Sequence, residues 1–294
     1  MQPRSDEDID IKERAKGPFA RFFNSGWSHL VRLMAVNVLF IVFNIPSILL
    51  SYFLSFIFLP VMIPAFNWEK FIVVTLPDGS SNISYELFML LVVFFVTFVV
   101  SSLLVCIGPF QAGFCQVYKD IRNGTSFSLF GSFKTGLKDN WKKSLASMFI
   151  GLVVTLILLL AISFYLNMKN SAGTVIGAVF VVLLIAFVLI QNFAYNLMVY
   201  TDLKLGKIYK NAILFVLLRF VPCLGAALVV IIFNVMIPFV LLMSASYLTL
   251  GVFVFLYSFL VISWVQYFLA FYSASLIERY VADNKSSGEI KEKS

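Results

Sequence analysis

Charged residues are scarce in this sequence. Of its 294 residues only 13% are Asp, Glu, Lys or Arg, whereas 61% are hydrophobic. A soluble domain carries about 25% charged residues, which keep its surface in contact with water. The composition therefore excludes a water-soluble globule and predicts a chain that has the lipid bilayer as its main solvent.

The residues that most often carry enzyme chemistry are scarce as well. His29 is the single histidine, and the three cysteines, Cys106, Cys115 and Cys223, are widely spaced. An odd number at such spacing forms neither a disulfide framework nor a C-x-x-C site. The sequence also lacks an H-E-x-x-H motif and paired carboxylates. We therefore expect no cofactor, no metal ion and no catalytic residue, and we predict that the protein is not an enzyme.

Long uncharged runs dominate the sequence. They cover residues 33–68, 87–118, 144–168, 170–201 and 220–277. A membrane-spanning helix needs about 20 predominantly apolar residues, so the first four runs each hold one span and the last holds two. The sequence thus predicts an all-α, polytopic membrane helix bundle with six transmembrane helices, at about 34–59, 87–106, 145–168, 175–197, 224–242 and 248–272.

Lysine and arginine gather on one side of these predicted spans. With the N-terminus inside, the cytoplasmic segments are 1–32, 119–143, 202–219 and 278–294, and they hold 20 of these residues. The outer loops hold Lys70 and Lys169 alone. This asymmetry predicts a multi-pass protein of the bacterial plasma membrane with both termini in the cytoplasm. It also explains the formal charge of +7 without a nucleic acid partner.

The ends of the chain differ in composition from its middle. Residues 1–16 carry both charges and few apolar side chains, which predicts a disordered cytoplasmic tail. Residues 17–281 form the predicted six-helix domain, and 282–294 a polar cytoplasmic tail. After Gly17, the residues Phe19, Phe23 and Trp27 recur at helical spacing and predict an interfacial helix.

Residues 126–143 form the second of three predicted amphipathic segments, the third being 203–219. An apolar row steps by four from Leu129 to Trp141, with a lysine row beside it. This pattern is typical of a helix that lies on the inner leaflet. Docking of a cytosolic partner is the alternative. The candidate docking or interfacial residues are Phe133, Lys134, Leu137, Lys138, Trp141 and Lys142.

Uncharged polar residues are the other notable side chains within the predicted spans. They are Asn37, Asn44, Gln191, Asn192, Asn196, Asn234 and Gln266. Hydrogen bonds between membrane helices, which average about 0.6 kcal/mol each, are one explanation. The other is a path for a polyhydroxylated solute, with Asn192, Asn196, Asn234 and Gln266 as its candidate polar lining.

Short motifs near the span ends carry a family resemblance. They are Asn44-Ile45-Pro46, Gly108-Pro109-Phe110-Gln111-Ala112-Gly113, and Asn140-Trp141-Lys142. In these motifs the chain resembles the YesL-like family of bacterial integral membrane proteins, in the form of the longer variants with an inserted outer loop. Members often sit beside binding-protein-dependent carbohydrate importers and are regarded as auxiliary transport proteins or as proteins of unknown function. The resemblance supplies no catalytic residues.

Two functions are compatible with these features. The first is a non-catalytic auxiliary or regulatory component of carbohydrate uptake, with 126–143 and 203–219 docking subunits of an importer. The alternative is a self-contained carrier or channel for a small neutral solute, lined by the amides. In either case the lipid bilayer is the principal partner.

The predicted orientation can be tested by cysteine labelling. In a variant without its native cysteines, Lys138→Cys and Lys204→Cys are expected to react with a membrane-impermeant maleimide from the cytoplasmic side only. Lys70→Cys, in a predicted outer loop, is the control that reacts from outside. Labelling of positions 138 and 204 from opposite sides would overturn the six-span topology.

Overall fold

The computed structural model of the chain describes residues 17–62, 108–124, 127–168, 170–243 and 246–282. The regular elements of these residues are all helical. They are α2 (Pro18–Ser28), α3 (Leu30–Met62), α6 (Gly108–Asn123), α7 (Leu129–Asn167), α8 (Ser171–Tyr200), α9 (Leu205–Leu218), α10 (Phe220–Ile231), the π-helix η1 (Ile232–Met236), α11 (Ile237–Met243), α12 (Tyr247–Phe259), α13 (Val261–Ile277) and the π-helix η2 (Glu278–Ala282). Within these ranges the predicted all-α class is confirmed.

Four of the described segments are long and apolar enough to cross a bilayer. They are Leu30–Phe53, Leu129–Asn167, Ser171–Tyr200 and Phe220–Leu242. A fifth candidate consists of α12 and α13, which meet at an angle of 44°. These segments correspond to five of the predicted spans and fit a helical membrane protein. The remaining predicted span, 87–106, lies outside the described residues, as do nearly all of the outer loop 60–85 and of both predicted tails, so the count of six stays a prediction.

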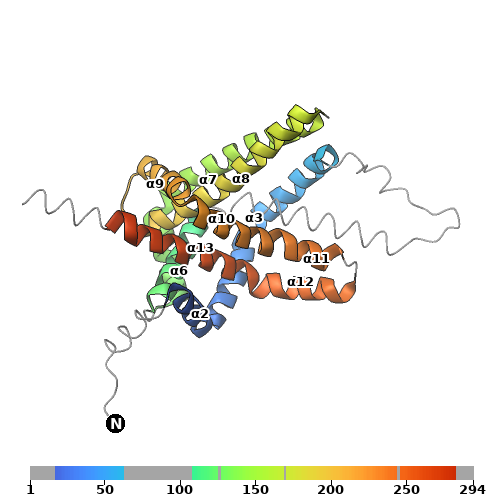
Figure 1. Cartoon of the computed structure of the whole chain (residues 1–294). Helices are drawn as coiled ribbons and strands as arrows, with labels where there is room; N and C mark the ends of the chain where they lie inside the picture. The colour runs from blue at the N-terminus through green and yellow to red at the C-terminus, as the bar shows by residue number, and fades with distance from the viewer. Residues whose placement is uncertain (1–16, 63–107, 125–126, 169, 244–245, 283–294) are drawn as a thin grey trace, which may run out of the picture.

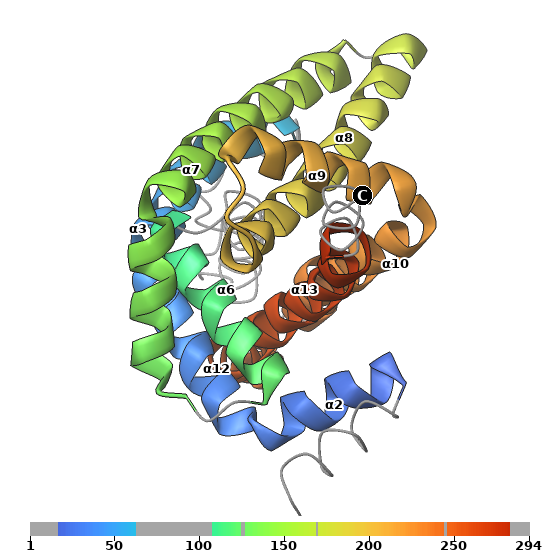
Figure 2. The ribbon, with the colours of Figure 1, turned by 90° about the vertical axis from the view of Figure 1, so that its left-hand side faces the viewer.

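The helices pack tightly at one end of the molecule and diverge toward the other (Figure 1). We call the packed end the base: α6, α9, α13, residues 129–147 of α7 and residues 189–200 of α8. Two clusters of buried hydrophobic side chains fill it. From the base, the α7–α8 hairpin and the α11–α12 hairpin extend to separate far ends, with α3 between them. Figure 2 shows α6 enclosed by the curve of α7.

The diverging parts expose much apolar surface. Val182 on α8 is 62% exposed, and Val240 on α11 is 67% exposed. Large contiguous apolar patches of this kind do not stay in contact with water in soluble monomers. Because the outward sides of α7, α8, α10 and α12 carry such residues throughout, the diverging parts fit a lipid environment.

The predicted surface helix at 126–143 and the predicted span at 145–168 are one helix. α7 runs without a break for 39 residues, which is about 58 Å and nearly twice the thickness of a bilayer core. No proline occurs in it, and the Ser144 hydroxyl donates to Asn140 O (2.8 Å), so this polar side chain finds its partner within the helix. The expectation of a separate helix on the inner leaflet is therefore wrong.

The apolar row of α7 also faces inward from Leu129 to Leu137, and its last residue, Trp141, is exposed. Phe133 is 7% exposed and packs on Phe43 of α3 and on Phe114 of α6, with ring centroids 5.3 and 5.0 Å apart. Leu129 and Leu137 pack against the same cluster. A lipid-facing row was the wrong interpretation, because the same helical spacing serves a protein core equally well.

Small residues let α6 and α7 approach closely. A Cβ on Gly136 would lie 2.6 Å from Gln116 Cβ and 2.7 Å from the backbone oxygen of Ala112. A Cβ on Gly113, across the same contact, would lie 2.7 Å from the Phe133 ring. The contact therefore requires glycine on both helices, as in other closely packed membrane helix pairs.

This contact predicts a large effect of one methyl group. Gly136→Ala is expected to lower stability by about 1–3 kcal/mol, because the backbone of α6 must move away. Gly206→Ala is the matched control, since a Cβ there meets nothing within 4 Å and alanine favours helix. Thermal unfolding in detergent measures both. Equal melting temperatures for the two variants would show that α6 and α7 are not in close contact.

Candidate functional site

A hydrogen-bonded group of three side chains joins α7, α8 and α9. The Gln191 amide nitrogen Nε2 donates to Ser147 O (2.9 Å) and to Ser147 Oγ (3.0 Å). The Tyr209 hydroxyl donates to Gln191 Oε1 (2.8 Å) and lies 2.8 Å from the Ser147 hydroxyl. Gln191 fits there because Gly151 leaves room for it; a Cβ on Gly151 would be 2.9 Å from Gln191 Nε2. The group fixes α9 to both spans of the hairpin.

The predicted amide lining does not form one group. Asn192 and Asn196 are buried on α8, and each Nδ2 donates to the carbonyl four residues earlier, Val188 O and Asn192 O (2.9 Å each). Gln266 on α13 accepts from Gln111 of α6 (3.1 Å). Asn234 lies half-buried on η1. Asn192 and Asn196 thus bond to the backbone of their own helix, whereas Gln266 bonds to a side chain of α6.

The hydrogen-bonding groups that the sequence analysis did not select are Gln111, Ser147 and Tyr209. Tyr209 lies in a predicted surface segment, and serine is common in membrane helices without a partner in another helix. The glycine at 151, four residues after Ser147, was the one available signal for close packing at this point.

Two basic residues at the base bind groups at helix ends. One binds the last turn of α8, and the other holds η2 in place. Lys119 Nζ donates to Val199 O (3.0 Å) in the last turn of α8 and lies 4.9 Å from the centre of the Tyr200 ring. Arg122 forms a bidentate pair with Glu278 (2.5 and 2.7 Å) at the start of η2. Glu278 lies beyond the predicted sixth span, and its hydrogen bond with Arg122 holds its pKa below the usual value of a glutamate.

Three lysines of α7 and three at the start of α9 are exposed, whereas Lys143 of α7 is half-buried. We define the basic face as Lys134, Lys138 and Lys142 of α7 together with Lys204, Lys207 and Lys210 at the start and along the first turns of α9. Asp139 and Asp202 are the acidic residues within 129–143 and 202–210. Trp141, 49% exposed, lies beside Lys142. Of the six docking candidates, the three lysines and Trp141 are therefore accessible, whereas Phe133 and Leu137 belong to the core.

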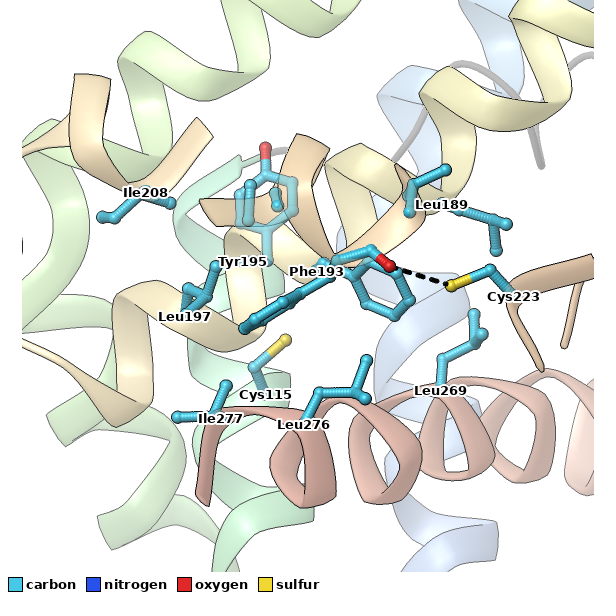
Figure 3. Close-up of a cluster of buried hydrophobic side chains, with 14 of the residues drawn as sticks. Cys115, Leu189, Phe193, Tyr195, Leu197, Ile208, Cys223, Leu269, Leu276 and Ile277 are labelled. Atoms are coloured by element: carbon cyan, nitrogen blue, oxygen red, sulfur yellow. Dashed lines mark hydrogen bonds between the residues drawn. The ribbon is translucent and has the colours of Figure 1, made fainter. Parts of the chain in front are cut away.

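The core beneath these residues is apolar and holds both described cysteines. Figure 3 shows Cys115, Phe193 and Leu197 together between the ribbons, with Leu276 and Ile277 of α13 facing them. Cys223 is buried too, and its sulfur lies 3.6 Å from Phe215 O. In the described part of the chain no three His, Cys, Asp or Glu side chains are placed to hold a metal ion.

Comparison with known proteins gives one family match. Residues 87–162 match the family DUF624, described as a protein of unknown function. The described part of this match contains α6 and most of α7, so the close contact at Gly136 lies within it. No curated protein and no solved structure matches the chain.

The group around Gln191 predicts a measurable role for one hydroxyl. Tyr209→Phe removes it and leaves Gln191 Oε1 buried with one donor fewer, so we expect a loss of about 1–3 kcal/mol. The control is Tyr247→Phe, because Tyr247 is 70% exposed. Thermal unfolding compares the two, and faster amide exchange in α9 of the Tyr209 variant is the second readout. Identical unfolding of both variants would contradict the assignment.

Proposed function

We propose that this chain is a non-catalytic, auxiliary membrane protein that binds a subunit of a carbohydrate importer at the cytoplasmic surface through its basic face. The observation that carries the proposal is the contrast between two sets of polar residues. The amides of Asn192 and Asn196 inside the bundle bond to the protein itself, whereas the lysines of the basic face are exposed.

The basic face stands on helices that are fixed in place. The lysine row of α7 lies along the same turns as Gly136, which packs on α6. α9 is bound to α7 and α8 through Tyr209. Side chains on rigid elements present a more exact surface than side chains on loops. The two lysine rows therefore suit a partner with a defined acidic patch.

The charge of the basic face suggests how the partner would be recognised. Residues 129–143 hold four lysines against one aspartate, and residues 202–210 hold three against one. Complementary charge steers association and excludes partners of the wrong sign. Carbohydrate import as the process comes from the resemblance to the YesL-like family, whose members often sit beside such importers, and it is part of the proposal.

A carrier or channel for a small neutral solute is the second candidate. Its support is Asn196 Oδ1, which is buried and has no hydrogen-bond partner among the described residues. Against it, the Nδ2 groups of Asn192 and Asn196 both donate to backbone carbonyls of α8. A solute would have to replace these bonds, so docking is the better supported function.

Purification from native membranes in a mild detergent tests the docking proposal. We expect importer subunits to co-purify in stoichiometric amounts at low salt and to dissociate as salt screens the lysines. Replacing Lys134, Lys138 and Lys142 by Glu is expected to weaken binding about tenfold or more, because three attractive charges become repulsive. The matched control replaces the same lysines by Arg, which keeps the charge and the partner.

Two results would count against docking. One is isolation of the chain without importer subunits at low salt. The other is unchanged co-purification of the three-glutamate variant. Solute uptake by the purified chain in liposomes, abolished by Asn192→Ala with Asn196→Ala, would favour the carrier instead.

A further inference from the structure

The last predicted span is broken, and its residues do not explain the break. α12 ends at Phe259 and α13 begins at Val261, with Leu260 between them in a non-helical conformation (φ −137°, ψ −58°). Sharp bends in helices usually occur at proline or glycine, or where another group enters the hydrogen-bond ladder. Residues 257–263 contain neither proline nor glycine. The cause must therefore come from another part of the chain.

A single side chain of α3 enters the break. Asn37 is fully buried, and its Nδ2 donates to the carbonyls of Tyr257 (2.7 Å) and Ser258 (2.8 Å) in the last turn of α12. Its Oδ1 accepts from the backbone N–H of Ser263 (2.7 Å) in the first turn of α13. Helix ends leave such carbonyls and N–H groups without partners inside the helix. The amide of Asn37 thus satisfies both sides of the break at once.

The neighbouring span is irregular where it faces α12. It contains the π-helix η1, between α10 and α11. The Tyr257 hydroxyl donates to Phe233 O within η1. A π-helical turn inside an α-helix is rare and occurs mostly at functional positions. Tyr257 is therefore held by α3 through its carbonyl and by η1 through its hydroxyl.

A small hydrophobic core spans the break, apart from the two main clusters. We call α11 and α12 the arm. Leu242, Phe253 and Tyr257 of the arm form a separate buried cluster with Val261 and Val265, the first residues of α13. The two main clusters fill the base instead. In Figure 1 the arm extends away from the base, on the opposite side of α3 from the α7–α8 hairpin.

From these observations we infer that the arm is a moving part of the protein. It pivots at Leu260 and at η1, where the two spans that carry it are irregular. The hydrogen bonds of the Asn37 amide hold the arm in the observed position, because they join both sides of the pivot. Domain motions of this kind turn on a few residues at the ends of helices. When these hydrogen bonds of Asn37 break, α12 rotates toward the axis of α13.

The size of the motion follows from the geometry. α12 has 13 residues and is therefore about 20 Å long. Straightening the 44° bend moves its far end by about 15 Å. Distances between spin labels on the arm and on the α7–α8 hairpin report such a shift directly.

The experiment uses Val254→Cys on α12 and Val182→Cys on α8, both exposed positions, in full-length protein without native cysteines and reconstituted in nanodiscs. We expect one narrow distance distribution when Asn37 is intact. Asn37→Leu keeps the branched shape and the number of heavy atoms of the side chain and removes its three hydrogen bonds, so a second population, shifted by up to about 15 Å, is expected. Asn192→Leu makes the same change at a buried amide that bonds to its own helix, and it should leave the distribution unchanged.

An unchanged distribution in Asn37→Leu would overturn the inference, because packing alone would then fix the bend. The same holds if Asn192→Leu produces the same shift as Asn37→Leu. Should Asn37→Leu fail to fold, Asn37→Ala decides the matter, since it removes the same three hydrogen bonds without adding volume. A broader distribution in that variant supports the moving arm, and an unaltered one rejects it.

Discussion

Within a bilayer, a polar group has only the protein itself as a hydrogen-bond partner, and this constraint shapes the whole described structure. Gln191 reaches into the neighbouring helix for the carbonyl of Ser147. Lys119 binds the end of α8, and Asn37 serves the two ends of a broken span. Each of these side chains links two or more helices. Gln191 and Asn37 do so within predicted spans, where no water is available to replace the bond. The polar residues of the spans are therefore the connections that set how the helices lie.

The sequence predicts the positions of the helices along the chain more reliably than it predicts what each helix face contacts. Uncharged runs and lysine placement are local features, so the apolar segments and the helical class follow from them directly. The row from Leu129 to Leu137 shows the limit, because an inward-facing and a lipid-facing row have the same spacing. The continuity of α7 through Asn140 and Ser144 was also missed. The start of the uncharged run at residue 144 suggested a boundary, whereas a helix continues across a change of polarity as long as nothing breaks its backbone hydrogen bonds.

Part of the candidate site could also be predicted, because exposed charges are a local feature of the sequence. Exposed lysines stay exposed in most folds, and Lys134, Lys138 and Lys142 are accessible as expected. Partners distant in sequence cannot be inferred from one chain alone. Asn37 and Ser263 are 226 positions apart, and no spacing rule connects them. Asn192 and Asn196 show a third case, in which a side chain that the sequence presents as a possible lining donates to the backbone one turn earlier in its own helix.

The length of α7 has a mechanical consequence. Lys134 near its beginning and Asn167 at its end are about 50 Å apart along one uninterrupted helix. A rod of this length acts as a lever. If a protein bound at the lysines tilts α7 by about 5°, the opposite tip is displaced by about 4 Å. A change of tilt at the lysine end of α7 is therefore transmitted to the Asn167 end by one uninterrupted helix.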